Sequence, residues 1–154
     1  MKNLTGTKFP TLFLAALIGL MMALPASQAL AQMVHKLAVH VDSGDPKVQN
    51  LALNNVQNVA KYYASKDEKV MIEVVTYGPG LHMLRTDTSK VKDRVQKISL
   101  ELDNVSFAAC DNTWRKMSKK AGKQVPIMAE AKHVPSGVIR LIELQEKGWS
   151  YLRP

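Results

Sequence analysis

The chain contains one cysteine, Cys110, placed where a strand is expected to give way to a helix. The apolar run 105–109 precedes it, and Asp-Asn-Thr-Trp at 111–114 follows it. A thiol at such a turn lies near the positive end of the helix dipole, which favours the nucleophilic thiolate. Covalent chemistry at sulfur is therefore the first hypothesis for this protein.

A single cysteine cannot form a disulfide within the chain. In an exported protein such a cysteine is buried and inert, paired with another chain, or reactive. Buried cysteines are common in protein cores, so the sequence leaves these three alternatives open.

Other polar and glycine residues follow the expected strands at their carboxyl ends. In open parallel sheets ligands bind beyond those ends, so we expect these residues to meet on one rim. Glu73 differs, because it stands mid-strand among apolar residues, where a carboxylate needs a partner. Glu73 is therefore expected either to pair with a lysine at an edge or to line the site. The weaker candidates for ligand binding are His40, Asp42, Gly78, Gly80, His82, Arg85, Asn112, Thr113 and His133.

Several established site types are not indicated. The glycines of 78–80 lack the GxGxxG and Walker spacings, which favours a tight turn over a phosphate loop. The histidines show neither HxH nor HExxH spacing, so we predict no metal and no cofactor. A serine hydrolase would need a nucleophile elbow, which is absent. A cysteine protease would need a base near Cys110, and nothing selects one of the histidines, so enzymatic activity stays open.

Beyond residue 34 the pattern alternates between strands and helices. Strands are expected over 35–41, 70–77, 105–109, 131–134 and 149–152. Helices are expected to begin at Pro46 after an Asp45 cap, after a cap at Thr88 or Ser89, near Trp114 with an end at Gly122, and at Gly137. This alternation predicts an α/β fold, a three-layer α/β/α sandwich of flavodoxin-like appearance with a mostly parallel sheet of about five strands. The order of the strands is not predicted.

The first 31 residues have the pattern of a cleaved secretory signal peptide. Lys2 and Lys8 precede an apolar stretch at 12–24, which is short for a membrane span of about 20 residues. A small-x-small pattern ending at Ala31 favours cleavage there, with an uncleaved anchor as the alternative. We therefore predict a periplasmic protein with a single domain over 32–154 and no membrane span after cleavage.

The chain is basic, with a formal net charge of +8. Its basic residues are scattered and are not interleaved with aromatic residues, which argues against a nucleic-acid platform. An ordinary solvated surface is the favoured interpretation of the charge, and nucleic acid is not expected as a partner.

Four segments resemble the DsrE/DsrF-like family (the DsrEFH superfamily). They are Tyr-Gly-Pro-Gly-Leu at 77–81, Ala-Ala-Cys-Asp-Asn-Thr at 108–113, the stretch 134–138 and the ending 143–154. The resemblance implies the α/β/α fold and a homo-oligomer, a trimer or hexamer. It also implies a sulfur relay in which a cysteine after the third strand carries a persulfide, and Cys110 matches that position. Asp111 beside the thiol would oppose its ionisation.

Three functional hypotheses follow. The first is a periplasmic sulfur carrier in sulfur metabolism, with Cys110 taking sulfane sulfur from a donor protein and passing it to an acceptor. The alternative is a non-catalytic protein of the same fold that binds a small ligand or serves in assembly. A thiol redox sensor that forms sulfenic acid is the third, and the absence of a resolving cysteine counts against it.

Overall fold

The computed structural model describes residues 34–154, so the predicted signal peptide at 1–31 lies outside the described residues. Each expected strand and helix is present, with its start within about three residues of the predicted one, and the helix expected near Trp114 begins at Asp111. In chain order the elements are β1 (Val34–Val41), α1 (Pro46–Ala64), β2 (Lys69–Thr76), the 3-10 helix η1 (Gly78–Leu84), α2 (Lys92–Glu101), β3 (Val105–Cys110), α3 (Asp111–Ala121), β4 (Ala131–Val134), α4 (Gly137–Glu146) and β5 (Ser150–Leu152).

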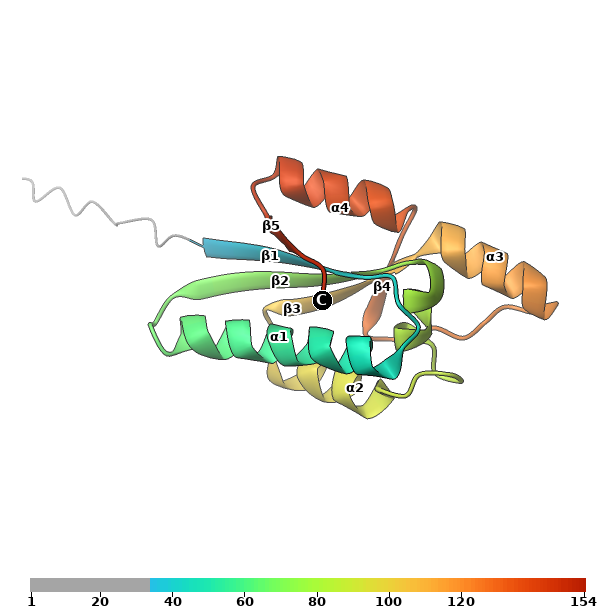
Figure 1. Cartoon of the computed structure of the whole chain (residues 1–154), viewed down its shortest axis with the longest axis horizontal. Coiled ribbons are helices and arrows are strands. Elements are labelled where there is room, and N and C mark those ends of the chain that lie inside the picture. Colours follow the sequence, from blue (N-terminus) through green and yellow to red (C-terminus); the bar gives the residue numbers. More distant parts are fainter. Residues whose placement is uncertain (1–33) are drawn as a thin grey trace, which may run out of the picture. The chain divides into compact units, whose positions relative to one another are not determined.

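The five strands form one parallel sheet in the order β4-β3-β2-β1-β5. The predicted α/β fold class is thus confirmed, and the sheet is parallel throughout. Because all strands run in one direction, their carboxyl ends share one edge of the sheet (Figure 1). Cys110 lies at this edge, opposite Val134 of β4.

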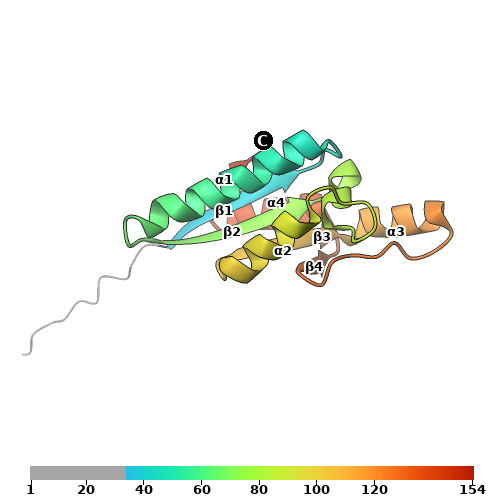
Figure 2. The same cartoon turned by 90° about the horizontal axis from the view of Figure 1, so that it is seen from below.

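Helices lie on both faces of the sheet. The first face is covered by α1 and α2, with the larger apolar core between them and the strands. This core includes the fully buried side chains of Leu53, Ile72 and Phe107. The second face is covered by α4, whose Leu141 and Leu144 pack on Ala38 and Ala108 and form a smaller core. Figure 2 shows α1 and α2 together on one side of the strands, with α4 behind them.

The starts of the helices follow the expected local chemistry. The carboxylate of Asp45 accepts a hydrogen bond from the N–H of Lys47 at 2.8 Å, and Pro46 is the first helical residue of α1. Before α2, the hydroxyl of Ser89 accepts from the N–H of Val91 at 3.2 Å, but the helix begins at Lys92. The predicted cap at Ser89 therefore serves the turn before the helix.

The helix α3 extends beyond the carboxyl ends of the strands (Figures 1 and 2). None of its residues is fully buried, and it ends at Gly122 in the left-handed conformation with φ 67°. Trp114 ties it to the following loop by donating its indole N–H to the carbonyl of Val125 at 2.9 Å.

Residues 78–84 differ from expectation, because they form η1 where only a tight turn was expected. Gly80 explains the position of this segment. Its N–H donates to the carbonyl of Asp42 at 3.0 Å, and a Cβ at this residue would lie 2.0 Å from the carbonyl oxygen of Val41. Glycine is thus required because η1 packs directly on the backbone at the end of β1.

No helix within residues 34–154 is long and apolar enough to cross a membrane.

Candidate functional site around Cys110

Cys110 is the last residue of β3 and the residue that precedes the first turn of α3. Side chains alternate along a strand, so Cys110 faces the same side as Ala108, toward α4. The residue is 3% exposed. The sequence left exposure of the thiol open, and the structure places it under the start of α4.

Donors from two helix starts surround the sulfur. They are the backbone amides of Asn112 and Thr113 in α3, the amide of Gly137 at the start of α4, and the hydroxyl of Thr113. Burial raises the pKa of the Cys110 thiol, but these donors together hold it below the ordinary value for cysteine. Amides at the start of a helix favour a negative charge on the sulfur.

The hydroxyl of Thr113 is oriented by Gly78. The N–H of Gly78 donates to Oγ1 of Thr113 at 2.9 Å. Because Oγ1 accepts this hydrogen bond, its own proton is free to be donated to another acceptor. That acceptor is the Cys110 sulfur. Gly78 has φ 51°, a left-handed conformation that favours glycine, and this conformation presents its N–H to Thr113.

Gly137 lets α4 approach the thiol. A Cβ added at this residue would lie 2.8 Å from Cδ1 of Tyr77 and 3.3 Å from Cβ of Cys110.

One turn later, Arg140 binds the buried carboxylate of Glu73 through two nitrogens, at 2.6 and 2.7 Å. The partner of Glu73 is thus an arginine of α4, neither an edge lysine nor a ligand in the site. This ion pair fixes the first turn of α4 over β2.

A second polar cluster adjoins the thiol across the ring of Tyr77. His40 is 5% exposed, and its ring stacks on that of Tyr77 with centroids 4.7 Å apart. Its Nδ1 lies 2.7 Å from the hydroxyl of Tyr151, and its buried Nε2 has no hydrogen-bond partner. Burial lowers the pKa of His40, opposed by Asp42 and assisted by Arg153.

The end of the chain closes this cluster. Strand β5 pairs with β1 so that Tyr151 lies beside Ala38. Arg153 then donates to the carboxylate of Asp42, from Nη2 at 2.7 Å and from Nε at 3.3 Å. Burial, with Asp42 as the next cause, raises the pKa of Tyr77. The last residues of the chain therefore belong to the rim of the candidate site.

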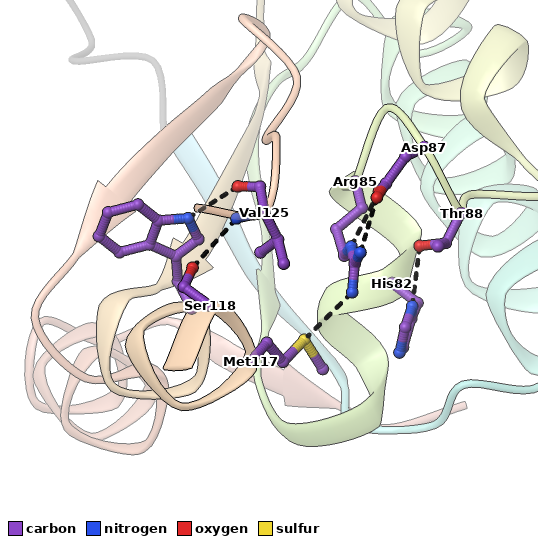
Figure 3. A network of polar contacts seen from close by, with 8 residues as sticks. His82, Arg85, Asp87, Thr88, Met117, Ser118 and Val125 are labelled. Carbon is purple, nitrogen blue, oxygen red and sulfur yellow. Dashed lines mark hydrogen bonds and ion pairs between the residues drawn. The ribbon is translucent and has the colours of Figure 1, made fainter. Parts of the chain in front are cut away.

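Two of the predicted ligand residues are engaged elsewhere, as Figure 3 shows. The guanidinium of Arg85 donates to both oxygens of Asp87, at 2.9 and 2.7 Å, and its Nη1 lies 4.0 Å from the sulfur of Met117. Nδ1 of His82 lies 2.8 Å from the hydroxyl of Thr88. Of these contacts, the one between Arg85 and Met117 joins the segment after β2 to α3. Nothing in them supports a role for His82 or Arg85 at the Cys110 sulfur.

His133 lies near Cys110 in the sheet but faces the other way. It pairs with Ala109, so both side chains point to the α1 and α2 face. Its Nδ1 lies 2.5 Å from the carboxylate of Asp111, and its ring meets that of Trp114 edge-on. The carboxylate of Asp111, expected to oppose ionisation of the thiol, is thus engaged by a histidine on the far side of the sheet.

No three histidine, cysteine, aspartate or glutamate side chains within residues 34–154 are placed to hold a metal ion. A hollow of about 520 Å³ lies at the amino ends of the strands, between Val34 and Leu102, and Cys110 does not line it.

Comparison with known proteins identifies a solved structure that is similar to this chain in sequence and in fold. A solved structure, the "Protein of Unknown Function MTH1491 from Methanobacterium thermoautotrophicum", superposes with a TM-score of 0.64. The two sequences are 31% identical over 78% of this chain and 99% of that one. The chain belongs to the family of MTH1491. Scans against protein-family models and against curated proteins gave no match.

Membership in the MTH1491 family establishes the fold and leaves the chemistry to the site itself. MTH1491 is described as a protein of unknown function, so no residue role is carried over from it. The resemblance to the DsrE/DsrF-like family stays a prediction.

Sequence reasoning did not single out four residues that shape the site. They are Tyr77, Gly137, Tyr151 and Arg153. Sequence analysis placed Tyr77 at the end of a strand and Gly137 at the start of a helix, and a glycine at a helix start is the available signal of close approach. Tyr151 and Arg153 belong to the ending 143–154 that carries the family resemblance, but their place in the site depends on β5 pairing with β1.

Proposed function

We propose that the protein is an exported, periplasmic member of the DsrE/DsrF-like group that carries sulfane sulfur as a persulfide on Cys110. The observation that carries the proposal is the set of donors around the sulfur, three backbone amides and the Thr113 hydroxyl. A cysteine that only fills space needs no donors from two helix starts. This arrangement favours a thiolate, the form that attacks sulfur.

The transfer has two balanced steps. In the first, the Cys110 thiolate attacks the outer sulfur of a donor hydropersulfide. A new S–S bond forms, the S–S bond of the donor breaks, and its electron pair leaves on the donor thiolate. In the second, an acceptor thiolate attacks the outer sulfur on Cys110, and Cys110 leaves as a thiolate. The amides that lower the pKa of Cys110 also make it a better leaving group.

Access to the sulfur requires movement at the rim, because Cys110 is buried beneath Gly137 and beside Tyr77. The donor would reach the thiol after the start of α4 or the ring of Tyr77 moves aside. The same burial favours the second candidate function, a binding or assembly protein in which Cys110 is structural. In that case Cys110→Ser would leave function intact.

The test is the intact mass of the purified protein after incubation with inorganic polysulfide, beside Cys110→Ser. The carrier proposal predicts added sulfur atoms that reductant removes and that the variant lacks. Absence of an adduct on protein that remains folded by circular dichroism would overturn the proposal and leave the binding or assembly function.

A further inference from the structure

The basic residues of the chain are scattered with one exception, which is helix α3. This helix holds two basic pairs, at 115–116 and 119–120, and its single acidic residue is Asp111. Because the two pairs are four residues apart, their side chains lie on one face of the helix. All four are exposed. We call them the cationic face of α3, which consists of Arg115, Lys116, Lys119 and Lys120.

The charges of the cationic face are not neutralised by the described part of the chain. None of the four side chains forms an ion pair with a carboxylate within residues 34–154. The carboxylate of Asp111, in the first turn of the same helix, is engaged by His133. Arg115 donates to the side-chain oxygen of Asn112, which carries no charge.

This arrangement is unfavourable for a helix that has no partner. Like charges four residues apart repel each other and lower the stability of a helix. The helix dipole favours cations in the last turn, where Lys119 and Lys120 lie, but gives no such support to the pair at 115–116. A surface of negative charge placed against the helix would replace this repulsion with attraction.

The position of α3 leaves the cationic face open to a partner and indicates its chemistry. The helix extends beyond the carboxyl ends of the strands (Figures 1 and 2). Its large apolar side chains, Trp114 and Met117, pack against the main core of the protein. A helix that lies on a membrane needs such side chains for the lipid, and a nucleic-acid platform needs exposed aromatic rings for the bases. The cationic face offers charge alone.

We infer that the cationic face of α3 binds an acidic surface of another protein. The helix begins directly after Cys110, and the amides of its first turn contact the sulfur. A protein bound to α3 would therefore lie at the edge of the sheet that holds the thiol. That such a protein gives or receives sulfur rests on the proposed function, whereas recognition of an acidic surface does not.

The experiment is fluorescence anisotropy with a labelled poly-glutamate peptide, on protein expressed from the full sequence. The ionic strength is about 0.1 M, at which charges more than about 10 Å apart are largely screened, so that clustered charges matter more than net charge. We expect the peptide to bind. Replacing all four residues of the cationic face with glutamine, which keeps the helix propensity, should weaken binding by about tenfold or more.

The matched control removes the same number of charges at the amino ends of the strands, and it should bind within about threefold of the wild type. It replaces four exposed lysines with glutamine, namely Lys61, Lys66, Lys69 and Lys147. Circular dichroism establishes that both variants are folded. No binding of the peptide, or an equal loss in the two variants, would overturn the inference.

Anionic phospholipid vesicles and a single-stranded oligonucleotide, matched to the peptide in charge, are the competing probes. We expect both to bind more weakly than the peptide. Tighter binding of either one, lost in the α3 variant, would overturn the inference and assign the cationic face to lipid or to nucleic acid.

Sulfur uptake separates this inference from the proposed function. The α3 variant should still gain sulfur from inorganic polysulfide, because the donors around Cys110 come from other residues. Sulfur uptake without peptide binding would overturn the docking surface alone. Peptide binding without sulfur uptake would support the docking surface and overturn the carrier.

Discussion

Arg140 holds the buried carboxylate of Glu73 through two parallel hydrogen bonds, Nε to Oε1 at 2.6 Å and Nη2 to Oε2 at 2.7 Å. The pair joins the first turn of α4 to the middle of β2. Glu73 is 8% exposed, so without its partner the charge would stand desolvated in the sheet. Arg140 lies in the same first turn of α4 as Gly137, whose amide contacts the Cys110 sulfur.

Replacing Arg140 with methionine should lower the free energy of unfolding by about 3 kcal/mol. Removing one partner of a buried ion pair costs about 3–5 kcal/mol, and the partial exposure of Arg140 places the effect near the lower end. Urea denaturation followed by circular dichroism measures it.

The control is the double variant Glu73→Met with Arg140→Met. Because the buried charge is then gone, most of the lost stability should return. A single Arg140→Met variant within about 0.5 kcal/mol of the wild type would show that the pair does not anchor α4.

Thr113→Val should move the ionisation of Cys110 to higher pH. A hydrogen bond to a charged group contributes about 1.5 kcal/mol, so the thiolate fraction at neutral pH should fall about tenfold. The ultraviolet absorbance of the thiolate, titrated against pH, reports the change directly and needs no reagent to enter the site. Thr113→Ser keeps the hydroxyl and should titrate like the wild type. Equal titration curves for Thr113→Val and Thr113→Ser would show that the hydroxyl does not lower the pKa of Cys110.

The apolar runs predicted the parallel α/β fold because their lengths, their periods and the Gly and Pro residues between them together distinguish strands from helices. The place of Cys110 at the end of β3 followed from the same local pattern. Its donors from α3 were predictable too, since Asn112 and Thr113 are the second and third residues after Cys110. The local sequence thus supplied three of the four donors around the thiol, the amides of Asn112 and Thr113 and the hydroxyl of Thr113.

The other surroundings of Cys110 could not be predicted, because they depend on contacts between residues far apart in the sequence. Gly137 lies 27 positions after Cys110, and its amide reaches the sulfur because α4 packs back onto the sheet, through Leu141 and Leu144 and through the Arg140–Glu73 pair. His82 and Arg85 follow β2, as residues of the rim should, but η1 and the turn after it place His82 against Thr88 and Arg85 against Asp87 and Met117. Expecting a turn where a 3-10 helix forms misplaced both side chains.

Acidification should destabilise the protein through His40. Burial lowers the pKa of this histidine below 6.5, its ordinary value, so the unfolded chain binds the proton first as the pH falls. The stability contributed by neutral His40 is present above 6.5 and is lost as the pH drops below it, toward the lowered pKa of the folded state. Urea denaturation at several pH values between about 5 and 8 measures this slope.

His40→Gln removes the titrating group and should flatten the slope below pH 6.5. Tyr151→Phe keeps the histidine and removes only the hydroxyl 2.7 Å from Nδ1, so its slope should persist. A slope in His40→Gln equal to that of the wild type would assign the pH dependence to other groups.

Gly137→Ala tests the contact between α4 and the thiol. Alanine is favoured over glycine in a helix by roughly 0.5–1 kcal/mol, so without a clash the substitution would stabilise the protein. The new Cβ would lie 2.8 Å from Cδ1 of Tyr77 and 3.0 Å from its Cβ, and such overpacking costs about 1–3 kcal/mol. The net effect should be destabilising. Relief of the clash should draw the Gly137 amide away from the sulfur, which raises the pKa of Cys110.

Gly44→Ala is the matched control, because its Cβ would meet Pro79 at an ordinary 3.4 Å. A stabilised Gly137→Ala protein with an unchanged thiolate titration would show that α4 does not approach Cys110 as described.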